Sequence, residues 1–288
     1  MKNFTILIIF LFSINLFAQD VIVDLDDNGD IILFNSRVNK QPLIELAYSF
    51  PKITHQDFQN TNLIKNIGDF QLRLGYTYTS DSKIRKIYEE YLLVGYSSPS
   101  FALSPNGAYQ SFETWKVGSI SRVSYALSLS SNVDFVPYYS GGLFFYSMSF
   151  KDGGTHLFNS SNDKTIISRT ADGKVHFGNM FESGIRFKLN NSFSLFGGYS
   201  GNVFYPRFMT WKFLGSLVTY QIGLTLIENF DSYILRRSNV AGAIVDVILK
   251  SAYNYMFFYF QKGDMNWPVN TETPFVHEGP VVGVSFNF

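Results

Sequence analysis

Apolar and polar residues alternate along several stretches of this chain. The clearest stretch, DFQLRLGYTYT, covers residues 69–79 and carries a large apolar or aromatic side chain at every second position: Phe70, Leu72, Leu74, Tyr76 and Tyr78. The positions between them are small or polar. Because successive side chains of a β-strand point to opposite faces, this pattern predicts a strand with one apolar face and one polar face.

The alternation recurs often enough to predict ten strands. They lie near residues 43–50, 69–79, 87–97, 112–129, 133–149, 174–189, 192–204, 210–226, 250–261 and 277–288. Tilted strands of roughly 9 to 11 residues cross a bilayer. Two regions leave the count open. Residues 88–98 have no clean apolar face, and residues 228–251 fit either a short helix or part of a strand, so eight or twelve strands also fit.

The segments between these strands differ in length. Short polar turns are predicted at residues 130–132 and 190–191, and long polar loops cover residues 51–68, 98–111, 151–173 and 262–275. Transmembrane barrels have tight turns on the periplasmic side and long loops outside. The pattern therefore predicts an all-β protein, a transmembrane antiparallel up-and-down β-barrel over residues 41–288, with both ends in the periplasm.

The N-terminus indicates how the chain reaches a membrane. Residues 1–19 have Lys2, an apolar run from Phe4 to Phe12, and a mixed tail that ends at Ala18 and Gln19. This is the form of a secretory signal peptide. The apolar run is shorter than the roughly 20 residues that a spanning helix needs. We therefore expect cleavage after Ala18 or Gln19, and export.

Residues 20–40 contain the acidic stretch DLDDNGD. Its spacing matches the first half of a calcium-binding loop, but the twelfth position is Asn35 instead of the bidentate Glu that such a loop requires. Asn28-Gly29 is a strong hairpin signal, and β-forming residues flank it. We predict a periplasmic N-terminal extension with a β-hairpin, and calcium binding is the weaker alternative.

The chain ends in VVGVSFNF. Four apolar side chains share one face of this last segment: Val282, Val284, Phe286 and Phe288. The segment resembles the C-terminal targeting strand of bacterial outer-membrane β-barrel proteins. That resemblance implies recognition by the barrel-assembly machinery, contact with outer-membrane lipid, and a place in the cell outer membrane of a Gram-negative envelope. Its motif covers eight residues, so it indicates a class and no particular function.

Composition excludes several classes of site. Lys and Arg total 23 and Asp and Glu total 23, so the formal net charge is zero. A basic stripe of the kind that captures nucleic acid by counterion release is not expected. Cysteine is absent, which excludes disulfides, thiolate metal sites and cysteine nucleophiles. No cofactor is predicted.

Charged residues occur on the polar faces of the predicted strands. They are Glu45, Arg73, Arg122, Glu182, Arg186 and Lys188. Side chains fill a barrel of about eight strands, whereas open channels belong to much larger barrels. We therefore expect these residues to form a charge network inside the lumen, in preference to a solute filter. Glu45 and Arg73 lie on neighbouring strands and are the first predicted pair.

Aromatic residues near the predicted strand ends have a membrane role. They include Tyr48, Tyr76, Tyr78, Tyr199 and Trp211. Such residues form girdles at the lipid headgroups, because the ring is apolar while the hydroxyl or indole N–H seeks water.

The four histidines are placed in or beside the predicted external loops. They are His55, His156, His176 and His277. A cluster at one rim could bind a metal or supply a catalytic base. None has a ligand spacing, and loops ordinarily collect polar residues. We therefore predict no metal and no catalytic residue here.

Three functions fit these patterns. The favoured one is a small non-enzymatic outer-membrane barrel that serves envelope structure, an export or assembly machine, or recognition by its loops. A narrow channel or transporter for small or apolar solutes is the alternative, because of the inward charges. A surface hydrolase acting on lipid or peptide is the second alternative, because of the histidines.

Overall fold

The structure is a computed structural model that describes residues 24–25, 31–32, 39–58, 67–80, 85–102, 111–151, 160–190 and 192–288. The chain divides into two compact units, residues 1–39 and residues 40–288. In the first unit, β1 (Asp24–Leu25) and β2 (Ile31–Ile32) pair antiparallel, with Asp24 opposite Ile32. The turn between them and the predicted signal peptide, residues 1–19, lie outside the described residues.

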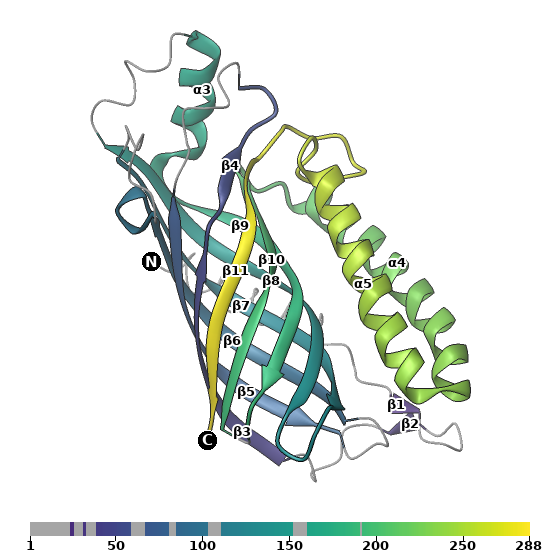
Figure 1. The fold of residues 1–288 in the computed structure, drawn as a ribbon. Helices are drawn as coiled ribbons and strands as arrows, with labels where there is room; N and C mark the ends of the chain where they lie inside the picture. The colour runs from purple at the N-terminus through teal and green to yellow at the C-terminus, as the bar shows by residue number, and fades with distance from the viewer. Residues whose placement is uncertain are drawn as a thin grey trace. The chain divides into compact units, whose positions relative to one another are not determined.

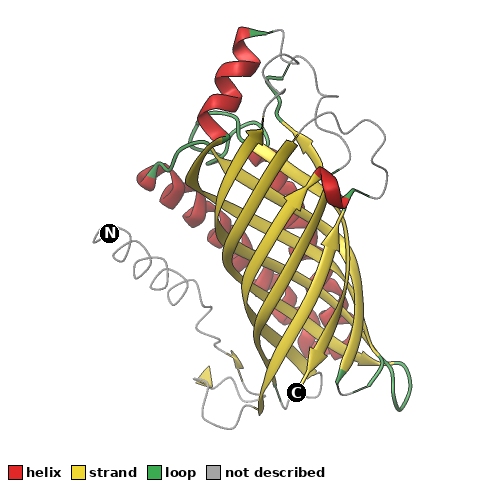
Figure 2. Cartoon of the chain, turned by 90° about the vertical axis from the view of Figure 1, so that its left-hand side faces the viewer, coloured by secondary structure: helices red, strands yellow, loops and turns green. Residues whose placement is uncertain are grey.

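Eight strands of the second unit form a closed barrel, which Figures 1 and 2 show from two sides. They are β3 (Asn39–Ser49), β5 (Gly68–Thr79), β6 (Arg85–Ser98), β7 (Ser111–Ser128), β8 (Asp134–Lys151), β9 (Asp172–Lys188), β10 (Phe193–Tyr205) and β11 (Phe275–Asn287). A short strand, β4 (Lys52–Thr54), also pairs with β11. The predicted fold class, an antiparallel β-barrel, is confirmed.

The last strand closes the barrel. Phe286 of β11 lies opposite Phe193 of β10 on one side and opposite Ile44 of β3 on the other. Beyond the strand, the Phe288 N–H donates to the Pro42 carbonyl at 3.0 Å. The C-terminal segment that carries the targeting pattern is therefore a member of the barrel wall.

The barrel has eight strands, so the prediction of ten is wrong and the alternative of eight is correct. Two predicted strands, 210–226 and 250–261, belong to helices α4 (Thr210–Arg237) and α5 (Asn239–Gln261). Residues 228–251 are helical except for Ser238, whose hydroxyl caps α5 by accepting from the Ala241 N–H at 3.4 Å.

Residues 210–226 and 250–261 were predicted as strands although they also carry a helical spacing of apolar residues. The exposed apolar residues of α4 recur at every fourth position: Val218, Ile222, Leu226 and Phe230. The buried positions of α5 follow the same period, as at Ala243, Val247, Lys250, Asn254 and Phe258. Dense aromatic residues in these segments also give matches at every second position, which resemble strands. The spacing of three to four is the stronger signal.

The two ends of the barrel differ. One end, called here the turn end, holds the C-terminus, the turn at residues 129–133 and the ends of strands β5 and β9. The opposite end, called here the loop end, holds η1 (Pro99–Phe101), α3 (Ser161–Thr170) and residues 262–274. This sorting of short and long connections is the one that the sequence predicts.

Helices α4 and α5 form a hairpin that leaves the loop end and lies along the outside of the barrel (Figure 1). Helix α5 packs over β7, β8, β9 and β10, and α4 packs on α5. The Phe258 ring lies 4.6 Å from the Phe181 ring of β9. A Cβ at Gly201 would lie 2.1 Å from a Phe181 ring carbon and 2.7 Å from the Phe258 ring, so bare backbone permits this close packing.

Trp211, predicted to belong to a girdle on a strand, is instead an exposed residue of α4. In the described part of the chain, no helix combines the length and the apolar character required to cross a membrane.

Candidate functional site

The lumen contains a layer of paired charges contributed by five strands. Its members, called here the charge layer, are three glutamates and three arginines: Glu45, Glu89, Glu182, Arg73, Arg122 and Arg186. All six are buried. Alternation places them here, because each occupies an inward position of its strand while apolar neighbours point outward.

Glu45 and Arg122 lie at the centre of the charge layer. Arg122 Nη1 lies 2.7 Å from Glu45 Oε2, and Arg122 Nη2 lies 3.1 Å from Glu182 Oε1. Arg73 joins the same two carboxylates, at 2.7 Å from Glu45 Oε1 and 2.5 Å from Glu182 Oε2. Glu45 and Arg73 are thus in direct contact.

Arg186 extends the charge layer toward the turn end. Its guanidinium donates to Glu45 Oε2 at 3.0 Å and pairs with both carboxylate oxygens of Glu89. Three positive charges therefore face three negative charges. Buried charges are tolerated in protein interiors when they are paired and hydrogen-bonded in this way.

Two tyrosines complete the charge layer. The Tyr91 hydroxyl donates to Glu89 at 2.7 Å and accepts from Arg122 at 2.8 Å. The Tyr138 hydroxyl donates to Glu182 at 2.9 Å, and its ring centroid lies 4.4 Å from the Arg122 guanidinium. Such contacts fix the orientation of the guanidinium groups in a site with a low local dielectric.

A second ion pair lies on the loop-end side of the charge layer. Lys116 Nζ is 2.9 Å from Asp69 Oδ2, and both side chains are buried. Gln71 links this pair to the charge layer, because its amide N–H donates to Asp69 while its carbonyl accepts from Arg73 at 2.8 Å. Ser97 donates to Asp69 at 2.8 Å.

Aromatic rings fill the lumen beyond the Asp69–Lys116 pair. This aromatic layer is made of Phe112, Phe144, Tyr146, Phe204 and Phe275, all of them buried. Phe204 is at its centre, with ring centroids 4.7 Å from Tyr146 and 5.2 Å from Phe144. From the turn end to the loop end, the charge layer, the Asp69–Lys116 pair and the aromatic layer follow one another, and their side chains fill the interior.

The described histidines belong to this aromatic region, and each has separate neighbours. His277 is buried between the rings of Phe204 and Phe112, at 4.2 Å and 5.6 Å. His55 lies in the loop after β4 against Phe58 and Phe275, where burial lowers its pKa below the usual value. His176 contacts Asp172 at 2.8 Å. His156 lies outside the described residues.

No group of histidines and carboxylates that could hold a metal ion occurs among the residues that the structure describes. The three described histidines do not converge on one position, so they give no geometric support to a shared metal site or a catalytic base.

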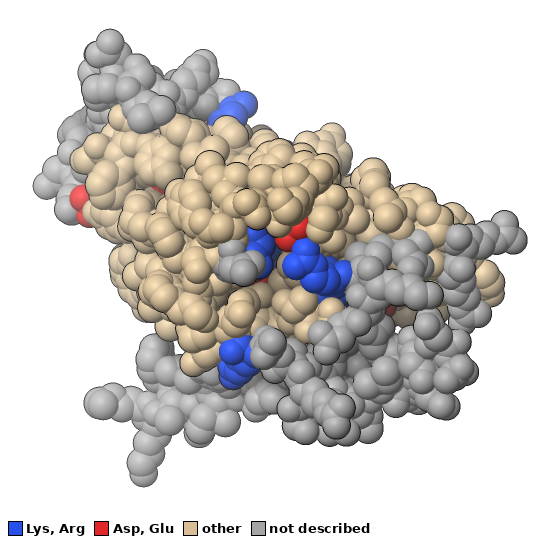
Figure 3. All heavy atoms as spheres, turned by 60° about the horizontal axis from the view of Figure 1, so that its bottom comes forward, with Lys and Arg blue, Asp and Glu red and all other residues tan. Residues whose placement is uncertain are grey.

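At the turn end the lumen narrows to a small hollow. It has a volume of about 20 Å³, and its lining includes Glu89, Arg186, Lys188 and Asn287. Figure 3, which looks from the turn end, shows Lys and Arg side chains gathered around this opening. A volume of that size holds about one water molecule. Lys188, predicted to join the network, is partly exposed and lines the hollow beside Glu89 and Arg186, but it is not a member of the ion pairs described above for the charge layer.

Sequence reasoning missed several members of this interior. Glu89 and Tyr91 lie in residues 88–98, where the apolar residues of both faces obscured the alternation. The inward set of β6 is Ile87, Glu89, Tyr91, Leu93, Gly95 and Ser97. Pairing Glu89 with the inward Arg122 directly opposite on β7 could have revealed this register.

The C-terminal residues occupy the outer face, as their pattern predicts. Val282, Phe286 and Phe288 are exposed and Val284 is partly exposed, while Val281 and Ser285, on the opposite face, are buried in the lumen. The structure does not test recognition of this strand by an assembly machine, which stays a prediction.

The chain matches no family model and no curated protein sequence. The solved structures to which it is similar include the following two. One is Neisserial surface protein A, with 12% identity, a TM-score of 0.36, and coverage of 86% of this chain and 97% of the other. The second is Ail, the attachment invasion locus protein of Yersinia pestis, with 9% identity, a TM-score of 0.33, and coverage of 86% and 98%.

Proposed function

We propose that this chain is a small, non-enzymatic outer-membrane β-barrel protein that acts through its outer surface and its loop end, with a lumen closed to solutes. The observation that carries this proposal is the charge layer. Six paired side chains and two tyrosines occupy the lumen, and eight strands leave little room beside them.

The outer wall supports a membrane location. Large apolar side chains point outward from many strands with a third to a half of their surface exposed: Ile44, Leu46, Phe70, Leu74, Leu92, Val94, Val117, Ile185 and Leu195. Soluble monomers rarely expose apolar surface on this scale. Near the turn end, Tyr76 and Tyr78 fit an interfacial girdle, and Lys40 Nζ lies 4.1 Å from the Tyr76 ring.

The loop end supports a role in recognition. Glu272 forms ion pairs with Arg207 at 2.5 Å and with Arg169 of α3 at 3.9 Å. These contacts join α3 to the segment that precedes β11, so the described part of the loop end includes an ordered contact between two connections. With the turn end in the periplasm, the loop end faces the outside of the cell.

The two other functions have less support. A solute channel requires a path through the charge layer and the aromatic layer. A hydrolase requires a converging set of catalytic groups, and the described histidines are separated by aromatic rings.

Electrical recording tests the closed lumen. Protein refolded into planar bilayers should give a flat current trace at moderate voltage, whereas discrete conductance steps would overturn the closed lumen.

Membrane fractionation and gel mobility test the location. The protein should be recovered with the outer membrane and should migrate differently before and after boiling, and recovery in the soluble fraction would contradict the proposal.

A further inference from the structure

We propose that the α4–α5 hairpin is embedded in the outer membrane and that its outward face contacts lipid acyl chains. The strands that the hairpin covers would then contact the helices instead of lipid. This inference rests on the proposed outer-membrane location and goes beyond it. Connections at the loop end of a barrel ordinarily extend into water. Here one of them returns along the wall as a pair of helices.

The outward face of α4 is apolar along one stripe. Val218, Ile222, Leu226 and Phe230 follow each other at intervals of four residues, and each exposes more than half of its surface. Side chains four apart share one face of a helix. Exposure of these apolar side chains to water is unfavourable, whereas contact with lipid acyl chains removes that cost.

The length of the uncharged part of α4 matches the membrane. Lys212 and Glu228 bound a run of fifteen residues, 213–227, without a charge. At about 1.5 Å per residue, the two charges lie about 24 Å apart along the helix axis. The apolar band of an outer-membrane barrel is about 25 Å tall. Alone, α4 lacks the apolar character needed to cross a membrane, but it is packed on α5, and α5 is packed on the barrel wall. In that setting, the charged ends of the run would lie near the two headgroup regions.

The charges at both ends of this run are paired within the protein. At the loop end, Lys212 Nζ donates to the Asn270 carbonyl at 2.8 Å. Toward the turn end, Lys250 Nζ lies 2.9 Å from Glu228 and 3.0 Å from Asp246. Lys250 also lies 5.3 Å from the ring of Tyr139, an outward residue near the turn end of β8.

Several polar groups of the hairpin are paired inside the protein, away from the outward face. Tyr220 donates to Asn254 at 2.6 Å between the two helices, and Ser216 donates to the Trp267 carbonyl at 2.8 Å. Asn179 of β9 donates to Gln261 at 3.0 Å, between the barrel and α5. A lipid environment requires such internal pairing, because acyl chains offer no hydrogen bonds.

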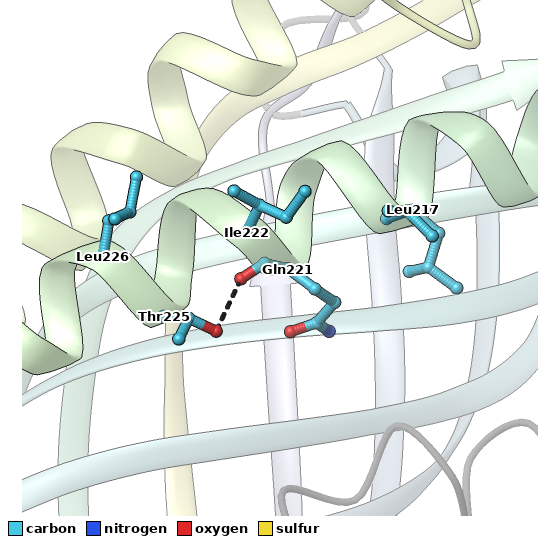
Figure 4. Close-up of a pocket in the computed structure, with 6 residues that line it drawn as sticks. Leu217, Gln221, Ile222, Thr225 and Leu226 are labelled. Atoms are coloured by element: carbon cyan, nitrogen blue, oxygen red, sulfur yellow. Dashed lines mark hydrogen bonds between the residues drawn. The ribbon is translucent and has the colours of Figure 1, made fainter.

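The surface of α4 also has a shallow hollow suited to an acyl chain. It has a volume of about 390 Å³ and is lined by Leu217, Val218, Gln221, Ile222, Thr225 and Leu226. Figure 4 shows these side chains on successive turns of the helix. The Thr225 hydroxyl donates to the Gln221 backbone carbonyl at 3.0 Å, which satisfies that hydroxyl within the helix.

The apolar belt of the barrel continues onto the hairpin. Leu92 and Val94 of β6 and Val282 of β11 are outward residues on strands that flank the covered wall, with 46% to 50% of their surface exposed. Beneath the helices the wall instead carries small residues such as Gly141 and Gly201. The hairpin thus occupies a stretch of wall that is shaped for helices, and its own apolar stripe completes the belt.

The absence of cysteine in the natural chain permits a direct test with single labels. Ile222→Cys reports on the hairpin, Leu92→Cys reports on the barrel belt, and Lys174→Cys at the loop end is a control in water. Each variant is labelled with an environment-sensitive fluorophore and folded into vesicles that contain lipids with brominated acyl chains. Labels at 222 and 92 should be quenched by at least twofold more than the label at 174.

The outcomes separate the two proposals. Strong quenching at 92 with quenching at 222 no greater than at 174 would overturn the embedded hairpin and leave the barrel in the membrane. Weak quenching at both 92 and 222 would overturn both proposals. A label at 222 that is shielded from brominated lipid and also from aqueous iodide would mean that protein covers this face, which also contradicts lipid contact.

Discussion

The lumen and the hairpin interface place polar groups in contrasting surroundings. Inside the barrel, three arginines balance three glutamates, and strands on all sides hold them. Between the hairpin and the wall, Lys250 is surrounded by Glu228, Asp246 and Asp231, and most other contacts are aromatic. Ion pairs of balanced charge thus stabilise the interior of the barrel. Packing of side chains around a single cation, Lys250, stabilises the contact between the hairpin and the wall. We expect damage to the first to affect the whole barrel and damage to the second to affect mainly the hairpin.

The largest effect is expected for Arg122→Ala. This change leaves Glu45, Glu89 and Glu182 with too few positive partners in a buried site, which should lower the free energy of unfolding by about 3–5 kcal/mol. Urea titration of the refolded barrel, followed by gel mobility, measures it. Arg85→Ala removes a partly exposed pair with Asp134 and should cost at most about 1 kcal/mol. Equal losses in the two variants would contradict the central role of the charge layer.

A smaller and more local effect is expected for Lys250→Met. The substitution keeps an unbranched side chain one atom shorter but leaves Asp246 and its acidic neighbours without their cation, at a cost of about 2–3 kcal/mol to hairpin docking. Limited proteolysis should then cut α4 or α5 while the barrel retains its unboiled gel mobility. Loss of barrel mobility at the same protease concentration would show that hairpin and barrel are not separable.

Two glycines of β10 provide a matched pair. Gly201→Ala places a Cβ 2.1 Å from the Phe181 ring, whereas a Cβ at Gly197 meets nothing nearer than 3.8 Å. Gly201→Ala should therefore cost about 1–3 kcal/mol through overpacking against α5, and Gly197→Ala should be close to neutral. Near-ultraviolet circular dichroism reports on the aromatic packing that is lost. Identical spectra for the two variants would contradict the packing of α5 against this strand.

The smallest effect on stability is expected for deletion of Phe288. Its side chain is 71% exposed, so removing it should change the free energy of unfolding by less than about 1 kcal/mol. The amount of protein assembled in the outer membrane should fall nonetheless, while export across the inner membrane stays normal. Quantitative blotting of the separated membrane and periplasmic fractions measures both. Unchanged assembly would contradict a targeting role for the last residue.

The strands of the barrel were predicted well from the sequence, because one face of each strand is apolar and points outward while the other carries polar residues that point into the lumen. Each half-buried strand from β5 to β10 matches a predicted segment within a few residues at its ends. The lumen residues Glu45, Arg73 and Arg122 followed from the same alternation. Glu89 did not, since inward Leu93 and outward Leu92 are both apolar and obscure the pattern.

The hairpin was not predicted, although a short helix was one of the two alternatives for residues 228–251, and the reason is different. Both sides of α5 are apolar, with Val247 and Phe258 against the wall and Ile248 and Tyr259 exposed. A helix that is apolar around most of its circumference has a weaker periodic signal, so matches at every second position could compete with the helical spacing. Contacts such as Phe258 with Phe181 join residues distant in sequence, so no local pattern could indicate that the helices lie against the barrel.

The position of the hairpin in the chain has a consequence for barrel closure. Strands β10 and β11 are neighbours in the wall, yet about 70 residues connect them, whereas about four residues connect β9 and β10. Each doubling of a flexible loop costs about 0.6 kcal/mol of closure entropy, so a loop of this length would cost about 2.5 kcal/mol more than a short turn. Because α4 and α5 are antiparallel, the start of α4 and the end of α5 lie at the same end of the hairpin, beside the ends of β10 and β11. A preformed hairpin would therefore shorten the distance that this connection has to span, and we expect it to lower the entropy cost of pairing β11 with β10.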